Sequence, residues 1–263
     1  MKILFENYAL DATVTSTSAS TNYPPSNLVH PFLRKRYQNI TGDDTITFLF
    51  DADKTVNSIY FGFHNADEET LLTEDGEVLT TEDDIDLFIS TATLIYNLYS
   101  FGGTLLYTGT LNMVNQFEAV HFTAVPLVRR VTVETQWSGL GNAGYLGGVG
   151  IGNSYTMPYF NTSWENGMVD NSPVSSSLVG QVLQNYIEPQ DVKTFTWSGV
   201  TSAIFAEIKA LVKATGKGKP IWVDYFELSH DVVQPIYAVT TGIENAGRNE
   251  MLYDFSMTFT EAR

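Results

Sequence analysis

The chain has 263 residues, of which 43% are hydrophobic and 13% aromatic, a composition typical of a globular protein. The net charge is −16, which argues against nucleic acid and anionic membranes as partners, because both need clustered basic residues. The absence of cysteine excludes disulfides, a thiolate nucleophile and Cys-ligated zinc. No apolar run approaches the roughly 20 residues that span a bilayer, and the first acid comes too early for a signal peptide, so we expect a protein made without export.

Residues 18–29 form the first distinctive stretch, a small-polar run followed by a Tyr-Pro-Pro turn and an Asn-Leu pair. Apolar residues then alternate over 46–50 and again over 59–63, with Asp51 and Asp53 between the two runs. Such alternation is typical of strands that place one face on a core. We therefore expect a strand, a turn at residues 51–54 and a second strand that ends near His64.

Two later stretches complete the strand pattern of the first half. Residues 126–134 alternate β-branched side chains around two arginines, and residues 147–158 are rich in glycine and end in a turn. Residues 139–144 fit G-x-G-x-x-G, but more glycines follow them and no amphipathic helix does. We therefore expect no dinucleotide cofactor, and we interpret these glycines as a loop and a strand that lets another backbone approach.

In this order, the stretches resemble discoidin-like β-sandwiches, the coagulation-factor type C family, in the version carried by virion proteins of tailed bacteriophages. The resemblance extends to about residue 160, and it implies an antiparallel jelly-roll sandwich over residues 1–160. It also implies a virion setting, in the tail or baseplate. The pattern departs from the family at residues 34–37, where Arg-Lys-Arg-Tyr stands in place of the tryptophan that many discoidin domains carry after the Asn-Leu turn.

Residues 66–86 contain ten acids and no base. Burial of so many unpaired carboxylates would be prohibitive, so we expect an exposed insertion in the first domain.

Polar and turn-forming residues at 159–173 mark a boundary, and residues 161–263 are predicted to form a smaller β-rich segment. One helix is expected at about 202–215, where apolar residues form a single stripe and Lys209 and Lys213 lie near the C-terminal end. Gly216 is the expected residue after the helix, and an apolar strand follows at 221–226. Residues 253–260 alternate with few charges, which predicts a strand with an edge open to a neighbouring chain.

The sequence indicates no catalytic, metal or cofactor site. The histidines at 30, 64, 121 and 230 are scattered, and no Gly-x-Ser-x-Gly motif occurs. Asp43, Asp44, Asp51 and Asp53 could supply calcium ligands, but aspartate also favours turns, and this second interpretation is preferred. Paired carboxylates for glycoside cleavage stay open, because thirty acids always offer some pair.

Two clusters are candidates for contacts with a partner or a glycan. The basic residues near Tyr37 would dock an acidic surface or form a solvated turn, and the aromatic residues at 155–164 would stack on sugars, anchor an interface or pack in a core. The full set of candidate interface or glycan contacts is Arg34, Arg36, Tyr37, Tyr159, Trp164, Tyr253 and Phe255.

From these features we expect a non-enzymatic structural component of a tailed-phage virion. It would act through protein–protein assembly, as a homo-oligomer among other virion proteins in a particle assembled in the host cytoplasm. The alternative is a carbohydrate-binding module that recognises a host-surface glycan. A sugar site needs exposed aromatic faces at one end of the sandwich, whereas an assembly protein exposes apolar edges on several sides.

Overall fold

The computed structural model describes residues 1–30, 35–40, 43–64, 92–113, 117–137, 145–161, 165–169, 174–176, 182–184, 190–216, 219–225, 235–249 and 252–262. These residues fall into two compact units. The first unit comprises residues 2–155 and 224–235, and the second comprises Met1, residues 156–223 and residues 236–263. The described part of the chain contains no helix long and apolar enough to cross a membrane.

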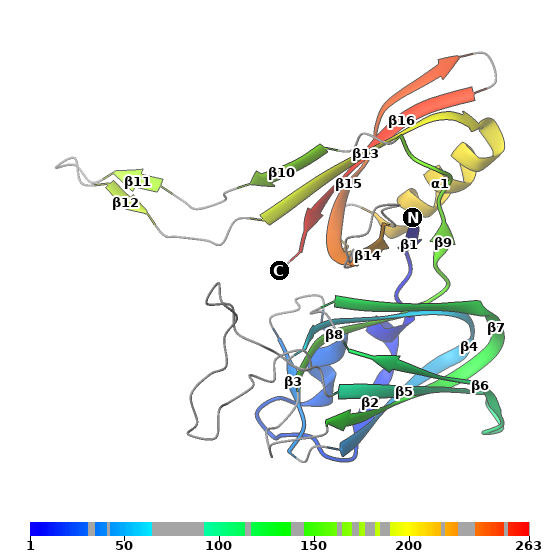
Figure 1. Ribbon diagram of the computed structural model, residues 1–263, viewed down its shortest axis with the longest axis vertical. Coiled ribbons are helices and arrows are strands. Elements are labelled where there is room, and N and C mark those ends of the chain that lie inside the picture. Colours follow the sequence, from blue (N-terminus) through cyan, green and yellow to red (C-terminus); the bar gives the residue numbers. More distant parts are fainter. Residues whose placement is uncertain are drawn as a thin grey trace, which may run out of the picture. The chain divides into compact units, whose positions relative to one another are not determined.

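The described residues up to 156 form nine strands and two 3₁₀ helices, and Figure 1 labels the strands. The strands are β1 (Lys2–Leu4), β2 (Thr13–Ser16), β3 (Tyr37–Gln38), β4 (Asp43–His64), β5 (Ala92–Tyr99), β6 (Leu105–Asn112), β7 (Phe117–Trp137), β8 (Tyr145–Gly152) and β9 (Tyr155–Thr156). The 3₁₀ helices are η1 (Tyr8–Asp11) and η2 (Pro25–Val29).

The first unit is an antiparallel β-sandwich built on two long, bent strands. Its strand order is β3-β8-β4-β7-β5-β6, and β2 pairs with the first half of β4. The first half of β4 lies between β2 and β7, and its second half lies between β8 and β7. The two halves of β4 and β7 therefore belong to two layers, and the buried side chains between them form the core, including Ile46, Phe48, Ile59 and Phe61.

The predicted turn at residues 51–54 is wrong, because β4 is a single strand from Asp43 to His64. The strand structure predicted on both sides of residues 51–54 is confirmed, but these residues form a bend within one strand and do not reverse the direction of the chain. The partner strand β7 is nearly as long and shares the register shifts between Leu49 and Ser58, so the pair bends together. Asp51 and Lys54 form an ion pair at 3.7 Å within this bend.

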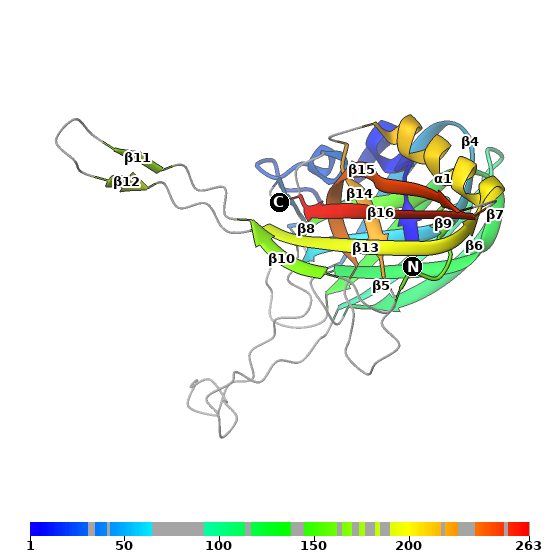
Figure 2. The same ribbon diagram turned by 90° about the horizontal axis from the view of Figure 1, so that it is seen from above.

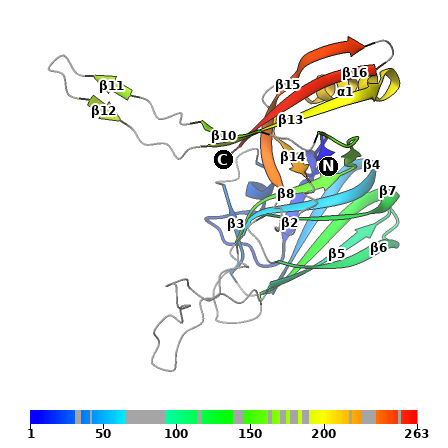
Figure 3. The ribbon, with the colours of Figure 1, turned by 45° about the horizontal axis from the view of Figure 1, so that its top comes forward.

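The second unit is a β-sheet with one helix, as predicted. Its sheet has the order β10-β13-β16-β15-β14, and α1 lies on one face of it (Figure 3). The strands are β10 (Glu165–Val169), β13 (Gln190–Thr201), β14 (Ile221–Asp224), β15 (Ile236–Asn249) and β16 (Leu252–Glu261). A separate pair, β11 (Val174–Ser176) and β12 (Val182–Gln184), continues the line of β10 and β13 away from α1 (Figure 2).

The helix prediction is confirmed, since α1 spans Ser202–Thr215. Phe205 and Ile208 of the predicted stripe are buried, and Gly216 ends the helix with φ 73°. Its N–H donates to the carbonyl oxygen of Val212 at 3.1 Å.

The prediction of an open edge at residues 253–260 is wrong. The strand exists as β16, but it lies between β13 and β15 and pairs with both. Phe255, Met257 and Phe259 are buried, so the apolar alternation that suggested an exposed edge belongs to a central strand. The acidic residues 66–86 lie outside the described residues, and their exposure stays a prediction.

Candidate functional site

Three side chains of the first unit form hydrogen bonds in the order of a serine hydrolase triad. His121 Nδ1 lies 2.8 Å from Ser58 Oγ, and His121 Nε2 lies 2.6 Å from Asp224 Oδ2. Ser58, however, is fully buried, and its hydroxyl donates to Asn57 Oδ1 at 2.8 Å. That amide oxygen also accepts the backbone N–H of Ser154, which fixes its orientation. Ser58 is therefore a buried residue held by Asn57 and His121, and it is not positioned as a nucleophile.

Asp44 is a buried acceptor in the first unit and not an open calcium ligand. Its carboxylate accepts hydrogen bonds from Ser16 Oγ at 2.8 Å, from Thr17 N at 3.0 Å, from Thr17 Oγ1 at 2.7 Å and from the Tyr37 hydroxyl. Burial and the bond to Asp44 raise the pKa of Tyr37 well above its ordinary value. These contacts join β2, β3 and β4, so Asp44 is a structural acceptor within a strand and not the turn residue that was predicted. Within the described residues, no three His, Cys, Asp or Glu side chains are grouped to hold a metal ion.

Arg36 is the candidate contact that the structure places on an aromatic surface. Its guanidinium lies 5.4 Å from the ring centroid of Tyr23 and 4.9 Å from that of Tyr145. Asn27 Nδ2 donates to the carbonyl oxygen of Arg36 at 2.9 Å, which holds the segment in place. Tyr37 beside it is buried, so the structure separates these two predicted contacts.

The other candidate contacts do not gather at one place. Tyr159 is 94% exposed, whereas Phe255 is 1% exposed and stacks on Trp197 at a centroid distance of 5.0 Å. Tyr253 stacks on Phe205 of α1 at 4.3 Å. Arg34 and Trp164 lie outside the described residues.

A surface that the sequence did not single out lies at the bend of the first unit. Leu49, Arg130, Tyr99 and Leu105 are paired across β4, β7, β5 and β6 in one row. The turn between β5 and β6 adds Phe101, and β7 adds Leu127 and Arg129. We call the set the turn surface: Leu49, Tyr99, Phe101, Leu105, Leu127, Arg129 and Arg130.

Phe101 is the most exposed residue of the turn surface, at 79%. Its turn is held by three hydrogen bonds between Ser100 and residues 103 and 104, at 2.9 to 3.2 Å. Gly103 has φ 80°, which glycine adopts without strain. A rigid turn therefore presents a large aromatic side chain to solvent, although burial would be expected for it.

Two arginines of β7 lie over two aromatic rings of the turn surface. The guanidinium of Arg129 lies 5.4 Å from the ring centroid of Phe101, and that of Arg130 lies 4.2 Å from the centroid of Tyr99. Arg130 Nε is buried and has no hydrogen-bond partner among the described residues. Leu127 is 63% exposed and adopts φ 58°, which is unusual for a leucine. The surface thus combines apolar area, fixed hydrogen-bond donors and backbone strain, a combination enriched at binding sites.

The signal for this site was present in the sequence. Residues 100–104 read Ser-Phe-Gly-Gly-Thr between two strand-like stretches, and an aromatic residue on a glycine turn has no core to pack against. The sequence pattern places Arg129 and Arg130 only within a strand. Their pairing with Tyr99 and Phe101 depends on strand register, which the sequence alone does not specify.

No protein-family model matches the chain, and no curated protein does. Among solved structures, it is similar to the lectin domain of lectinolysin complexed with Lewis b antigen, with 13% identity and a TM-score of 0.39 over 56% of this chain and 95% of that one. It is also similar to a chitosan-binding module from a Paenibacillus sp. IK-5 chitosanase/glucanase, with 17% identity and a TM-score of 0.40 over 56% and 99% of the two chains. A fucose-binding module from Streptococcus pneumoniae shows 13% identity and a TM-score of 0.39 over 56% and 94%.

The prediction of a mainly β protein, an antiparallel β-sandwich followed by a smaller β-rich segment with one helix, is confirmed. The interpretation as a structural component of a phage virion is corrected, because the structures found are carbohydrate-binding modules and fit the alternative interpretation better. None of these findings shows a phage origin.

Proposed function

We propose that the first unit is a non-catalytic carbohydrate-binding module and that its ligand lies on the turn surface. The observation that carries the proposal is the 79% exposure of Phe101 on a hydrogen-bonded turn, with the Arg129 guanidinium beside its ring. A sugar ring has an apolar face and a rim of hydroxyls, so it needs a flat apolar partner with hydrogen-bond donors close by. Phe101 would supply the apolar partner, and the Arg129 guanidinium beside its ring would supply the donors.

The strand register adds acceptors to the same end. Leu49 pairs with Arg130 and Lys54 pairs with Val128, so the exposed carboxylates of Asp51 and Asp53 lie in the bend between these pairs. Ionised carboxylates accept hydrogen bonds from hydroxyls. The bend and the turn together would therefore offer both donors and acceptors to a polyhydroxylated ligand.

A glycan array tests this function on the full chain. We expect the wild-type protein to bind a subset of glycans and the Phe101→Ala variant to lose at least about tenfold in affinity, or about 1.4 kcal/mol. Tyr159→Ala is the matched control, because it also removes an exposed aromatic residue, and it should bind as the wild type does. Absence of binding to any glycan, or equal losses in the two variants, would refute the proposal.

A further inference from the structure

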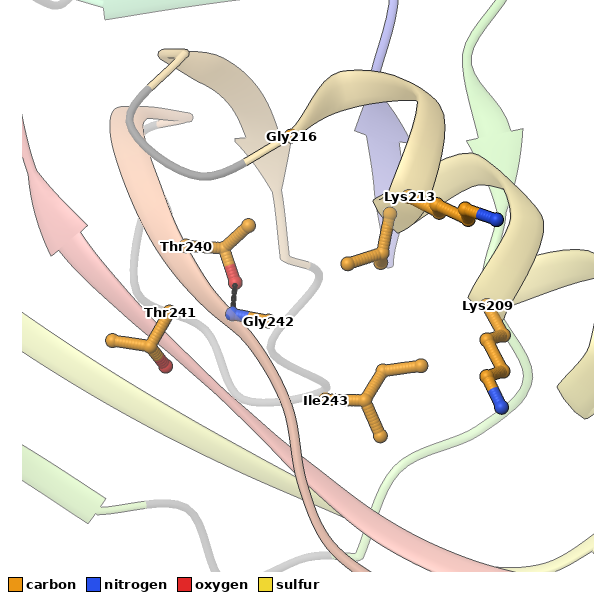
Figure 4. A pocket seen from close by; sticks show the side chains of 8 residues that line it. Lys209, Lys213, Gly216, Thr240, Thr241, Gly242 and Ile243 are labelled. Atoms are coloured by element: carbon orange, nitrogen blue, oxygen red, sulfur yellow. Dashed lines mark hydrogen bonds between the residues drawn. The ribbon is translucent and has the colours of Figure 1, made fainter.

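A cavity of about 360 Å³ lies in the second unit, between α1 and β15 (Figure 4). Lys209 and Lys213 at its rim are exposed, and Lys213 points away from Thr240 on the opposite wall. Thr241, also at the rim, donates its hydroxyl hydrogen bond to the Glu244 carboxylate. The described residues therefore direct no charged group into this cavity, and a partner surface is better defined in the first unit.

The first unit exposes an edge of its sheet at β6. This strand ends the order β3-β8-β4-β7-β5-β6, and within the described residues it pairs with β5 alone. Half of the backbone N–H and C=O groups of an edge strand point away from its sheet and can pair with another strand. The edge strands β2 and β3 of the same unit have four and two residues, whereas β6 has eight.

The edge at β6 carries none of the usual protection against pairing. Natural sheets commonly guard an exposed edge with charged residues or proline, and β6 reads Leu-Leu-Tyr-Thr-Gly-Thr-Leu-Asn over residues 105–112. Leu106 within it is 38% exposed. In a protein with a net charge of −16, a strand without carboxylates lets a second copy approach without local repulsion.

The two faces of β6 differ in chemistry. Tyr107 and Leu111 are half-buried and pack against the core of the first unit, and Tyr107 stacks on Phe122 at a centroid distance of 4.6 Å. Thr108 and Thr110 lie on the opposite face and are exposed. A matching partner strand therefore has apolar side chains on one face and small polar side chains on the other.

The strand β6 itself meets this requirement, because its residue types are symmetric about Gly109. When two copies pair antiparallel with Gly109 opposite Gly109, Thr108 of one copy lies opposite Thr110 of the other. In the same register, Tyr107 lies opposite Leu111. Residues that lie opposite each other share a face of the sheet, and both kinds of cross-strand pair stabilise sheets.

We propose that β6 is a self-association surface, through which two copies of this chain form an antiparallel dimer. The partner strand supplies the backbone hydrogen bonds that the free edge lacks and covers the half-buried sides of Tyr107 and Leu111. Because one strand pair makes a small interface, we expect a dissociation constant of about 10 µM. The association is independent of the glycan proposal, since Thr108, Gly109 and Thr110 do not belong to the turn surface.

Sedimentation velocity of the full chain between about 1 and 500 µM tests the proposal. We expect the wild type to change from monomer to dimer across this range. Thr108→Lys combined with Thr110→Lys brings like charges opposite each other in the proposed register and should raise the dissociation constant at least about tenfold. Thr13→Lys combined with Thr15→Lys is the matched control, because it changes two exposed threonines at the same spacing on β2, and it should dimerise as the wild type does.

A charge exchange tests the antiparallel register. Thr108→Glu combined with Thr110→Glu should also weaken self-association. An equimolar mixture of the glutamate and lysine variants should form a mixed dimer, identified by its mass, because each introduced lysine then lies opposite an introduced glutamate. A wild type that stays monomeric over the whole concentration range, a dimer that the lysine variant leaves intact, or variants that stay apart when mixed would each overturn the proposal.

Discussion

At the scale of single residues, the buried polar groups of the first unit bond to partners that are distant in the sequence. Asp44 accepts hydrogen bonds from Ser16 and Thr17, 28 and 27 positions earlier. His121 bonds to Ser58, 63 positions earlier, and to Asp224, 103 positions later. A buried polar group without such a partner is costly, so these contacts help to specify the fold. They also explain residues whose chemistry suggested a metal or a catalytic site.

Buried tyrosines predict a loss of stability at alkaline pH. Burial raises the pKa of Tyr96 to about 12, with a smaller contribution from the neighbouring Tyr107. Unfolded tyrosine ionises near pH 10, whereas folded Tyr96 stays protonated up to about pH 12. Between these pH values ionisation therefore stabilises the unfolded chain relative to the folded one. We expect the melting temperature to be insensitive to this group below about pH 9 and to fall as the pH rises through this window.

The Tyr96→Phe variant isolates this contribution. Its melting temperature should decline less steeply between about pH 9 and 11 than that of the wild type, because the ionising group is gone. Tyr159→Phe removes an exposed hydroxyl and should follow the wild-type curve. Parallel curves for Tyr96→Phe and wild type would contradict the account.

At the scale of elements, sequence patterns predict local structure better than strand pairing. The helix at Ser202–Thr215 follows from a stripe, two late lysines and a glycine, all within one segment. The single strand β4 does not follow from its own pattern, because residues 51–54 form a bend only through pairing with β7, which is nearly as long. In the same way, β16 is central because of its neighbours β13 and β15, which its own alternation does not reveal.

The glycine-rich strand β8 was predicted to let another backbone approach, and Gly152 does so. A Cβ at Gly152 would lie 2.5 Å from the carbonyl oxygen of Glu6 and 2.6 Å from Leu4 Cδ1. Gly152→Ala should therefore lower the free energy of unfolding by about 1–3 kcal/mol, since the backbone must move. Gly102→Ala is the control, because the nearest atom to its Cβ would be Ser100 Oγ at 4.0 Å, and its melting temperature should be nearly unchanged. Similar thermal shifts for both variants would show that the contact at Gly152 is unimportant.

At the scale of the whole molecule, chain order and spatial units differ. Asp224 belongs to the first unit, where it contacts His121, although it follows the helix of the second unit in the sequence, and a division by sequence pattern does not anticipate such a return. The candidate site is likewise formed by residues that are distant in the sequence. Leu49, Phe101 and Arg129 come from three separate segments, and the bend of β4 and β7 brings them to one end. The mainly β architecture was predictable from the alternation of apolar residues, whereas the turn surface becomes visible only when the pairing register of the strands is known.

The central claim is that a glycan binds at the turn surface of the first unit. The most direct measurement is NMR chemical-shift mapping of the full chain during titration with the strongest glycan from the array. The account predicts shifts concentrated at residues 99–105 and 127–130, with the Phe101 ring among the most affected. Shifts concentrated instead around Tyr23, Arg36 and Tyr145, or no shifts at a glycan concentration that saturates the array, would contradict it.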